Sequence, residues 1–253
     1  MQHIPMWLQA GAWGLVAGFA LVLGALVGYF VAVPKRLIAG VMAFGSGVLV
    51  SALSFELMDE AQATGGVTAT AIGFVSGAAV YSLANWALAY YGGKHRKRSN
   101  EHHQTAEKEN PGSGMAIAVG ALLDGVPESI VIGVSMLGGG KVSMVAVTAV
   151  FLSNIPEGLS SAAGMKQAGR GARYIFGVWC GIALMSGLAA VAGYTLFAGV
   201  SPQVIAATTA VAAGAILAML ADTMIPEAFE GSHNFAGLIT VMGFLAAFML
   251  SKA

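Results

Sequence analysis

Two short stretches of the sequence combine a proline with oxygen-bearing side chains that could bind a cation. They read Asp124-Gly-Val-Pro-Glu128 and Ser153-Asn-Ile-Pro-Glu157. Residues four positions apart lie on the same face of a helix, so Asp124 pairs with Glu128 and Ser153 with Glu157. Carboxylate, hydroxyl and amide oxygens are ligands that hard and borderline divalent cations take in proteins. The two stretches therefore predict a cation site built from two helices.

The proline of each stretch adds further oxygen atoms. Proline inside a helix removes a backbone hydrogen bond and releases the carbonyl group four residues earlier. For Pro127 and Pro156 these carbonyls belong to Leu123 and Leu152, directly before the paired side chains. A third Pro-Glu pair ends at Glu227, where a gating or interfacial role is as consistent with the sequence as a role in binding.

The sequence around these stretches is strongly apolar. Hydrophobic residues make up 57% of the 253 positions and charged residues 9%, against about 25% charged residues in soluble domains. An ionised carboxylate at the centre of a bilayer costs at least about 2.5 kcal/mol. No Lys or Arg lies among the acidic residues of the apolar segments, so we expect no basic partner for them and neutralisation by protons, water or a bound cation. These acidic residues are Glu56, Asp124, Glu128, Glu157, Asp222 and Glu227.

The elements that must position these side chains are membrane helices. A bilayer core about 30 Å thick needs roughly 20 apolar residues per helix. We predict an all-α polytopic membrane protein with a single transmembrane domain over residues 1–253. Eight segments have the necessary length, at residues 11–33, 37–57, 67–92, 114–138, 142–164, 174–198, 202–225 and 233–251.

Close helix packing is also expected, since 35 residues are glycine. Small residues four positions apart let two membrane helices approach each other closely. Gly14 with Gly18 and Gly24 with Gly28 have this spacing. The single cysteine, Cys180, lies in an apolar segment and has no second cysteine to pair with, so we expect it to serve packing.

The longest connection between the predicted helices, residues 92–114, is charged and polar and ends with Pro111 and glycines. Such a composition cannot bury a core, so this connection is expected to be flexible. It contains His95, His102 and His103. These histidines could recruit a metal ion, or they could be ordinary solvated histidines.

The distribution of basic residues predicts an orientation in the membrane. In the eight-helix arrangement ten Lys and Arg residues lie on one side and two, Lys141 and Lys252, lie on the other. The basic side faces the cytoplasm. Both termini then lie on the non-cytoplasmic side of the cell (inner) membrane, and the connection at residues 92–114 is cytoplasmic. The formal net charge of zero gives no indication of nucleic acid as a partner.

Acidic residues also gather at the outer end of the second predicted helix. Glu56, Asp59 and Glu60 lie there. They could form an entrance that attracts cations, and ordinary solvated capping explains them equally well.

The sequence resembles the ZIP (zinc/iron-regulated transporter-like) family of divalent metal transporters over nearly its whole length. The fourth helix of that family carries His-Asn-x-Pro-Glu-Gly and its fifth carries His-x-x-Pro-Glu-Gly, similar to the stretches at Asp124 and Ser153. The segment from Ala213-Gly214-Ala215 to Asp222-Thr-Met-Ile-Pro-Glu-Ala is similar to the family's seventh helix. The resemblance implies a 3+2+3 inverted-repeat bundle of eight helices that transports a divalent metal ion, with a homodimer as the assembly to consider.

The chain departs from the family pattern at the metal ligands. Asp124 and Ser153 stand in the places of the two histidines, and Gly125 stands in the place of the following asparagine. Ser186 falls where many members of the family have an acidic residue on the sixth helix. The resemblance then leaves one metal position with carboxylate ligands and two weaker oxygen ligands. The carboxylates are Asp124, Glu128 and Glu157, and the weaker ligands are Ser153 and Asn154.

An all-oxygen site changes the expected metal. Imidazole suits zinc, whereas carboxylate, carbonyl and water ligands suit manganese, magnesium or calcium. We expect the metal, which could be Zn, Mn, Fe or Mg, to be the substrate, with no bound cofactor. Two alternatives stay open. One is an intramembrane enzyme that uses Ser153 or Asp124, which would need a base that the apolar segments do not supply as histidine. The other is a carrier for another solute or a regulatory relative that does not transport metal.

Overall fold

The computed structural model describes residues 4–91, 93, 96, 113–137, 141–232 and 235–252. All regular secondary structure in these residues is helical, which confirms the predicted all-α class. The elements labelled η are π-helices. In chain order the elements are α1 (Met6–Phe30), α2 (Lys35–Ala52), η1 (Leu53–Leu57), α3 (Met58–Tyr90), α4 (Ser113–Ser135), α5 (Met144–Gln167), α6 (Ala172–Phe197), α7 (Pro202–Met219), η2 (Leu220–Met224), α8 (Ile225–Ser232) and α9 (Ala236–Ser251).

Several helices have the length and composition of membrane helices. Among the described residues five helical stretches are long and apolar enough to cross a bilayer, which fits an integral membrane protein. The helix α9 is apolar but shorter, and α5 is not one of the five. The predicted number of eight crossings therefore stays a prediction. The five stretches are Met6–Phe30, Lys35–Tyr90, Met115–Ser135, Ala172–Phe197 and Pro202–Glu230.

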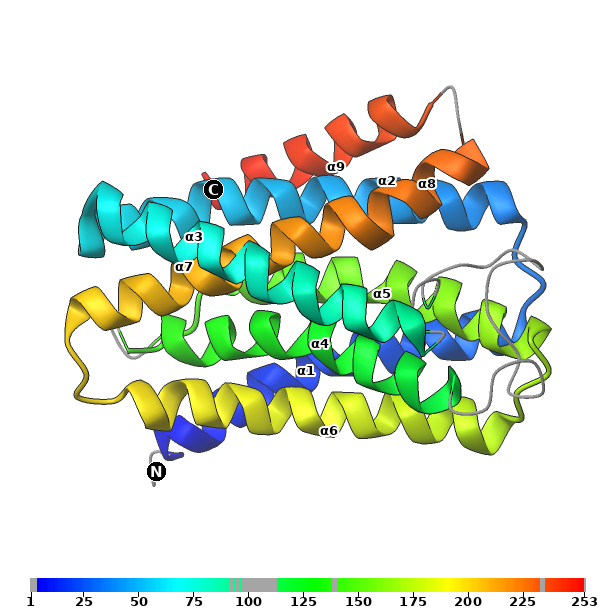
Figure 1. The fold of residues 1–253 in the computed structure, drawn as a ribbon, viewed down its shortest axis with the longest axis horizontal. Helices are drawn as coiled ribbons and strands as arrows, with labels where there is room; N and C mark the ends of the chain where they lie inside the picture. The colour runs from blue at the N-terminus through cyan, green and yellow to red at the C-terminus, as the bar shows by residue number, and fades with distance from the viewer. Residues whose placement is uncertain are drawn as a thin grey trace.

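The stretch Lys35–Tyr90 reverses its direction at one glycine. Gly66 has φ 75° and ψ 168° inside the span of α3. Glycine adopts a positive φ without steric cost, which other residues cannot do. In Figure 1, α2 and the main part of α3 accordingly run in opposite directions across the bundle. This reversal matches the gap between the predicted segments 37–57 and 67–92.

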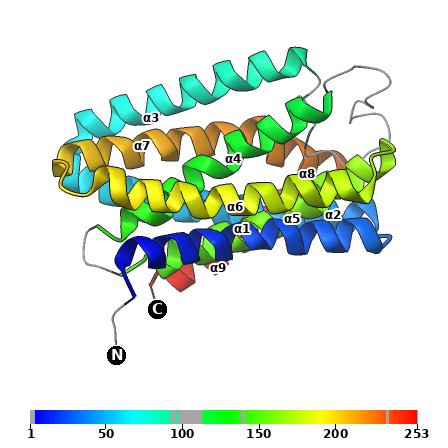
Figure 2. The ribbon, with the colours of Figure 1, turned by 90° about the horizontal axis from the view of Figure 1, so that it is seen from below.

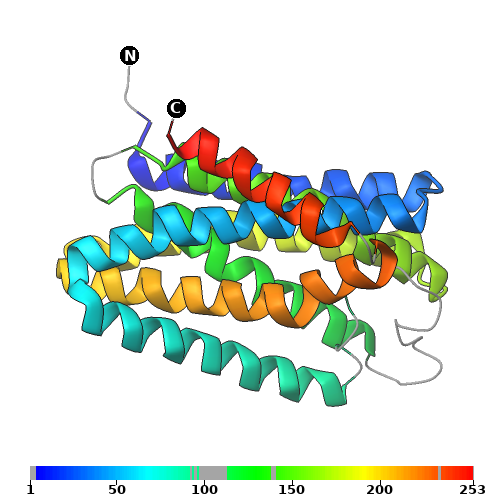
Figure 3. The same ribbon diagram turned by 90° about the horizontal axis from the view of Figure 1, so that it is seen from above.

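The helices α4 and α5, which carry both proline motifs, lie inside the bundle. The helix α5 packs against α1 and α2, and α4 packs against α6 and α7. The helix α3 packs on α7, and α9 packs on α2. Figures 2 and 3 show α3 at one face of the molecule and α1 and α9 at the opposite face. The motif side chains can therefore be surrounded by protein rather than by lipid.

Glycines let the packed helices approach each other closely. A methyl group at Gly47 of α2 would overlap the carbonyl oxygen of Thr240 in α9, and one at Gly243 of α9 would overlap that of Phe44 in α2. In three further helix pairs a glycine of each helix likewise lies against a backbone carbonyl oxygen of the other helix. These pairs are α3 with α7, α1 with α5, and α4 with α6. The glycines of these further contacts are Gly77, Gly214, Gly24, Gly158, Gly133 and Gly193.

The spaced glycines of α1 face two different neighbours. Gly14 and Gly18 lie against α6, and Gly24 and Gly28 lie against α5. Both pairs therefore mark helix contacts, as their spacing predicts.

The two ends of the bundle differ in their connections. In Figure 1 both termini lie toward one end, and the connections from α1 to α2 and from α5 to α6 lie at the opposite end. Basic residues flank these two connections, namely Lys35, Arg36, Lys166, Arg170 and Arg173. The predicted flexible connection at 92–114 lies outside the described residues, apart from Gly93, Arg96 and the start of α4.

Candidate functional site

All five predicted site residues are buried inside the bundle. Asp124 and Glu128 lie on α4, one turn apart, with 2% and 1% of their surface exposed. Ser153, Asn154 and Glu157 lie on α5 and are at most 3% exposed. Pro127 and Pro156 lie inside α4 and α5, as predicted. The sequence therefore places these side chains correctly in the interior.

Asp124 is held by a basic residue. The Nη2 and Nε atoms of Arg96 donate hydrogen bonds of 2.8 and 2.9 Å to Oδ1 and Oδ2 of Asp124, and both side chains are 1% exposed. The hydroxyl group of Tyr81, on α3, donates to Oδ1 of Asp124 at 2.7 Å. Our expectation that no basic residue accompanies the buried carboxylates is therefore wrong for Asp124. Arg96 belongs to a charged run of the sequence, and side chains of such runs normally stay in solvent, but the Arg96 side chain is buried.

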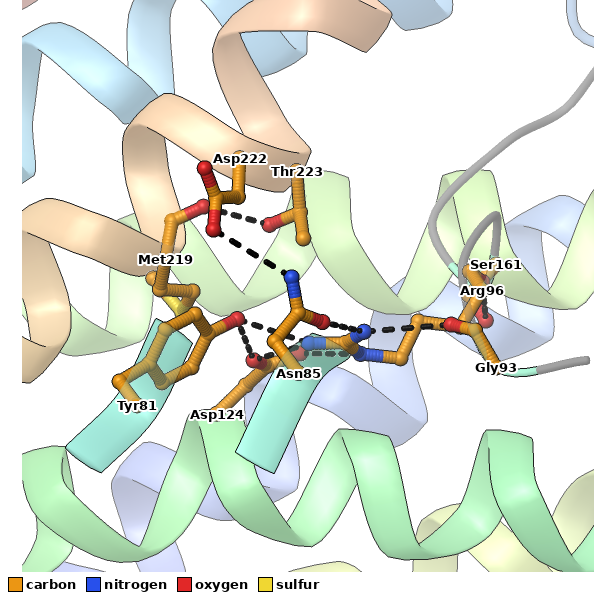
Figure 4. Close-up of polar contacts among 9 residues, drawn as sticks. All are labelled: Tyr81, Asn85, Gly93, Arg96, Asp124, Ser161, Met219, Asp222 and Thr223. Atoms are coloured by element: carbon orange, nitrogen blue, oxygen red, sulfur yellow. Dashed lines mark hydrogen bonds and ion pairs between the residues drawn. The ribbon is translucent and has the colours of Figure 1, made fainter. Parts of the chain in front are cut away.

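The guanidinium group of Arg96 contacts further oxygen atoms (Figure 4). Its Nη1 atom donates to Oδ1 of Asn85 at 2.8 Å and to the carbonyl oxygen of Gly93 at 3.2 Å. Its Nη2 atom also donates to the Tyr81 hydroxyl at 2.8 Å. Burial lowers the pKa of Arg96, but the charges of Asp124 and other neighbours raise it by more, so the pKa lies above its ordinary value. Arg96 is therefore a permanent positive charge at this site.

The network around Arg96 links four parts of the chain. The amide nitrogen of Asn85 donates to Oδ2 of Asp222, on η2, at 3.3 Å. The hydroxyl group of Ser161, on α5, donates to the backbone carbonyl oxygen of Arg96 at 2.6 Å. Figure 4 shows Asn85 between Asp222 and the guanidinium group. Arg96 thus connects α3, α4, α5 and η2.

Ser153 and Asn154 make contacts of a structural kind. The Ser153 hydroxyl donates to the carbonyl oxygen of Val150 in its own helix at 3.0 Å. The Asn154 amide nitrogen donates to the carbonyl oxygen of Ala17 in α1 at 2.9 Å. The bond from Asn154 therefore holds α5 to α1, next to the glycine contacts between the same two helices.

Glu128 lines a narrow pocket that also reaches Glu56. The pocket is small, with a cavity volume of about 20 Å³, which is enough for about one water molecule. It is otherwise lined by apolar residues of α2, η1, α4, α5 and α7. Glu56 is half-buried and lies on the π-helix η1. Its Oε2 atom accepts a hydrogen bond of 3.3 Å from Ser143, whose hydroxyl also caps the start of α5. Single π-helical turns frequently occur at functional sites.

Two further buried acidic residues are Glu157 of α5 and Glu227 of α8. The charge of Glu157 contributes to the raised pKa of Arg96, after the larger contribution of Asp124. Glu227 of α8 is 3% exposed and accepts a hydrogen bond of 3.2 Å from Ser160, one turn after Glu157 on α5. Glu227 is therefore buried beside α5, and the choice between a binding and a gating or interfacial role for the third Pro-Glu pair stays a prediction.

The carboxylates of the described residues do not form a metal centre. Among the described residues no three His, Cys, Asp or Glu side chains are arranged so that they could hold one metal ion. Asp124 is bonded to Arg96 and faces α3, whereas Glu128 lines the pocket toward η1. Histidines 95, 102 and 103, considered for metal recruitment, lie outside the described residues.

Comparison with protein-family models and with curated proteins finds no match for this chain. The resemblance to the ZIP family therefore depends on the quoted motifs and on the order of the helices.

Three residues of the site, Tyr81, Asn85 and Arg96, were not predicted from the sequence. Tyr81 and Asn85 are four positions apart on the apolar helix α3, so both face the same side. Polar residues at this spacing in an apolar segment could have indicated a buried polar face. Arg96 carries no such signal, because its neighbours in the sequence are basic and polar.

Proposed function

We propose that this chain is an integral membrane transporter of divalent metal cations. The cation would pass through the interior of the helix bundle and bind to the carboxylates of α4 and α5. Glu128 and Glu157 are the main ligands, and Asp124 joins them when it is not bonded to Arg96. Ser153 and Asn154 provide weaker oxygen ligands.

The observation that carries this proposal is the shared pocket of Glu56 and Glu128. Glu56, a half-buried residue of η1, and Glu128, a fully buried residue of a proline motif, line the same narrow space. In Figure 1 the join of α2 and α3 lies toward the end of the bundle with the termini, opposite the connections from α1 to α2 and from α5 to α6. A cation could therefore approach Glu128 from the end that we predict to be non-cytoplasmic.

The helix lengths support the inverted repeat of helices one to three with helices six to eight. Helices α2 and α7 each have 18 residues, and each continues directly into a π-helix of five residues. Gly47 and Gly214 are both the thirteenth residue of their helix, and both contact a backbone carbonyl oxygen of the partner helix. Figure 1 shows α2 and α7 running in opposite directions. Inverted repeats around a central site are typical of secondary transporters.

The donor atoms favour a metal other than zinc. The proposed ligands are all oxygen atoms, which suits manganese, iron(II), magnesium or calcium better than zinc. We infer that the site has changed its preference from zinc toward these harder cations. For the orientation, the distribution of Lys and Arg predicts that both termini lie on the non-cytoplasmic side of the membrane.

The other functions are less well supported. An intramembrane enzyme would need an activated nucleophile, and the Ser153 hydroxyl donates to the Val150 carbonyl oxygen rather than to a base. A carrier for another solute or a regulatory relative is the second candidate, because the ion pair of Arg96 with Asp124 occupies part of the proposed metal site.

A panel of cations tests the proposal. Purified protein in liposomes should take up manganese or magnesium in preference to zinc, and the same cations should raise its unfolding temperature in detergent, since a ligand of the folded state stabilises it. A clear preference for zinc would contradict the change in selectivity. If no divalent cation is taken up and none raises the unfolding temperature, metal transport is contradicted. A carrier for another solute or a regulatory relative is then favoured.

A further inference from the structure

Three side chains of α3 and α4 surround the guanidinium group of Arg96 with acceptors. Asp124 accepts from two of its nitrogens in a forked arrangement, and Tyr81 and Asn85 accept from the outer two. Planar forked contacts of this kind distinguish a guanidinium group from a metal ion or an ammonium group. The three side chains therefore form a site that is specific in shape and charge.

Arg96 enters this site from a connection rather than from a helix. Among the described residues it is the one basic side chain that is buried. The charged groups of a buried ion pair lose their hydration, and apolar residues of similar size often stabilise a protein as well or better. A gain in stability is therefore a weak reason for an arginine at this position, which directs attention to its contact with Asp124.

Asp124 has two competing partners under the proposed function. As a carboxylate one turn from Glu128, it would bind the transported cation. In the structure the same carboxylate binds Arg96. Two cations repel each other, so the guanidinium group and a divalent metal ion cannot both occupy the space beside Asp124 at full affinity.

We propose that Tyr81, Asn85 and Asp124 form a guanidinium-binding site that Arg96 of the same chain fills. Arg96 is then a built-in competitor of the transported cation for Asp124, and it sets the concentration at which the cation binds. This inference rests on the proposed function, because it assigns a role in the same transport site.

The first experiment compares manganese uptake by wild-type, Arg96→Ala and Arg96→Gln protein in liposomes. Without the competing charge, half-maximal uptake should need about tenfold less manganese. Guanidinium chloride at millimolar concentration, against sodium chloride at equal ionic strength, should reverse this gain in Arg96→Ala and leave the wild type unchanged. The matched control is Arg36→Ala, which removes an exposed positive charge in the first turn of α2.

The second experiment needs no substitution and so does not depend on the folding of a variant. Phenylglyoxal modifies accessible arginines, and mass spectrometry measures the extent at Arg96 in the wild-type protein. Saturating manganese should release Arg96 from Asp124 and increase its modification several-fold relative to Arg36.

The outcomes separate the two proposals. Suppose that the wild type takes up manganese. If the Arg96 variants then need the same manganese concentration for half-maximal uptake, or if manganese leaves the modification of Arg96 unchanged, the competition is overturned while metal transport stands. If the wild type takes up no divalent cation, metal transport is contradicted and the competition falls with it. A higher affinity in both variants, together with increased modification, supports both proposals.

Discussion

The Nη2 atom of Arg96 lies 2.8 Å from Oδ1 of Asp124, and both side chains are almost completely buried. This ion pair joins the connection after α3 to the first proline motif on α4. On the other side of that motif, Glu128 lines a pocket shared with Glu56. These two acidic residues of one helical turn thus have different surroundings, because Asp124 contacts a protein cation and Glu128 lines a pocket.

The ion pair predicts an asymmetry between single and double substitutions. Asp124→Leu alone should destabilise the protein by about 3–5 kcal/mol, because it leaves the buried guanidinium group without its counter-charge. The double variant with Arg96→Met should recover most of this loss. Unfolding by sodium dodecyl sulfate in mixed micelles measures these free energies. Equal destabilisation by the single and the double variant would show that the pair is not coupled.

The glycine contacts predict where the bundle does not tolerate a larger side chain. Gly47→Val and Gly214→Val should each destabilise the protein by roughly 1–3 kcal/mol, because the side chain would overlap a backbone carbonyl of the neighbouring helix. Gly181→Ala on α6 is the control, since no atom lies within 4 Å of a methyl group there. The same unfolding assay applies, and similar free energies for all three variants would contradict this account of the packing.

The half-buried Glu56 should affect the approach of the cation more than its binding. We expect Glu56→Gln to slow manganese uptake by roughly two- to tenfold at low salt, with a smaller effect at high salt, because exposed charges attract ions over a distance that salt shortens. Initial rates at two ionic strengths measure this. A loss of uptake that does not depend on salt would instead assign Glu56 to the binding site.

Most of the fold follows from the sequence, for a simple physical reason. Apolar runs such as residues 174–198 predict long apolar helices, and the observed helix Ala172–Phe197 agrees within two residues. The reversal at Gly66 was also placed between two predicted helices. The division of the seventh predicted helix into α7, η2 and α8 was not predicted, because hydropathy does not distinguish α-helical from π-helical turns.

The site was predicted only in part. Asp124 and Glu157 are buried as their proline motifs predict, because neighbouring helices exclude lipid from that face. The partner of Asp124 could not be predicted from its own helix. Arg96 lies 28 positions away in a basic run, and only the tertiary fold brings the two side chains together.

The most direct test of metal transport is the initial rate of manganese uptake into liposomes by wild-type protein and by the variants Glu128→Gln and Glu157→Gln. Even partners that only orient metal ligands change affinity by about 10- to 100-fold, so loss of a ligand should lower the rate by at least tenfold. Glu230→Gln, an exposed residue on α8, should keep the wild-type rate. Wild-type rates in folded Glu128→Gln and Glu157→Gln protein would contradict the assignment of the transport site.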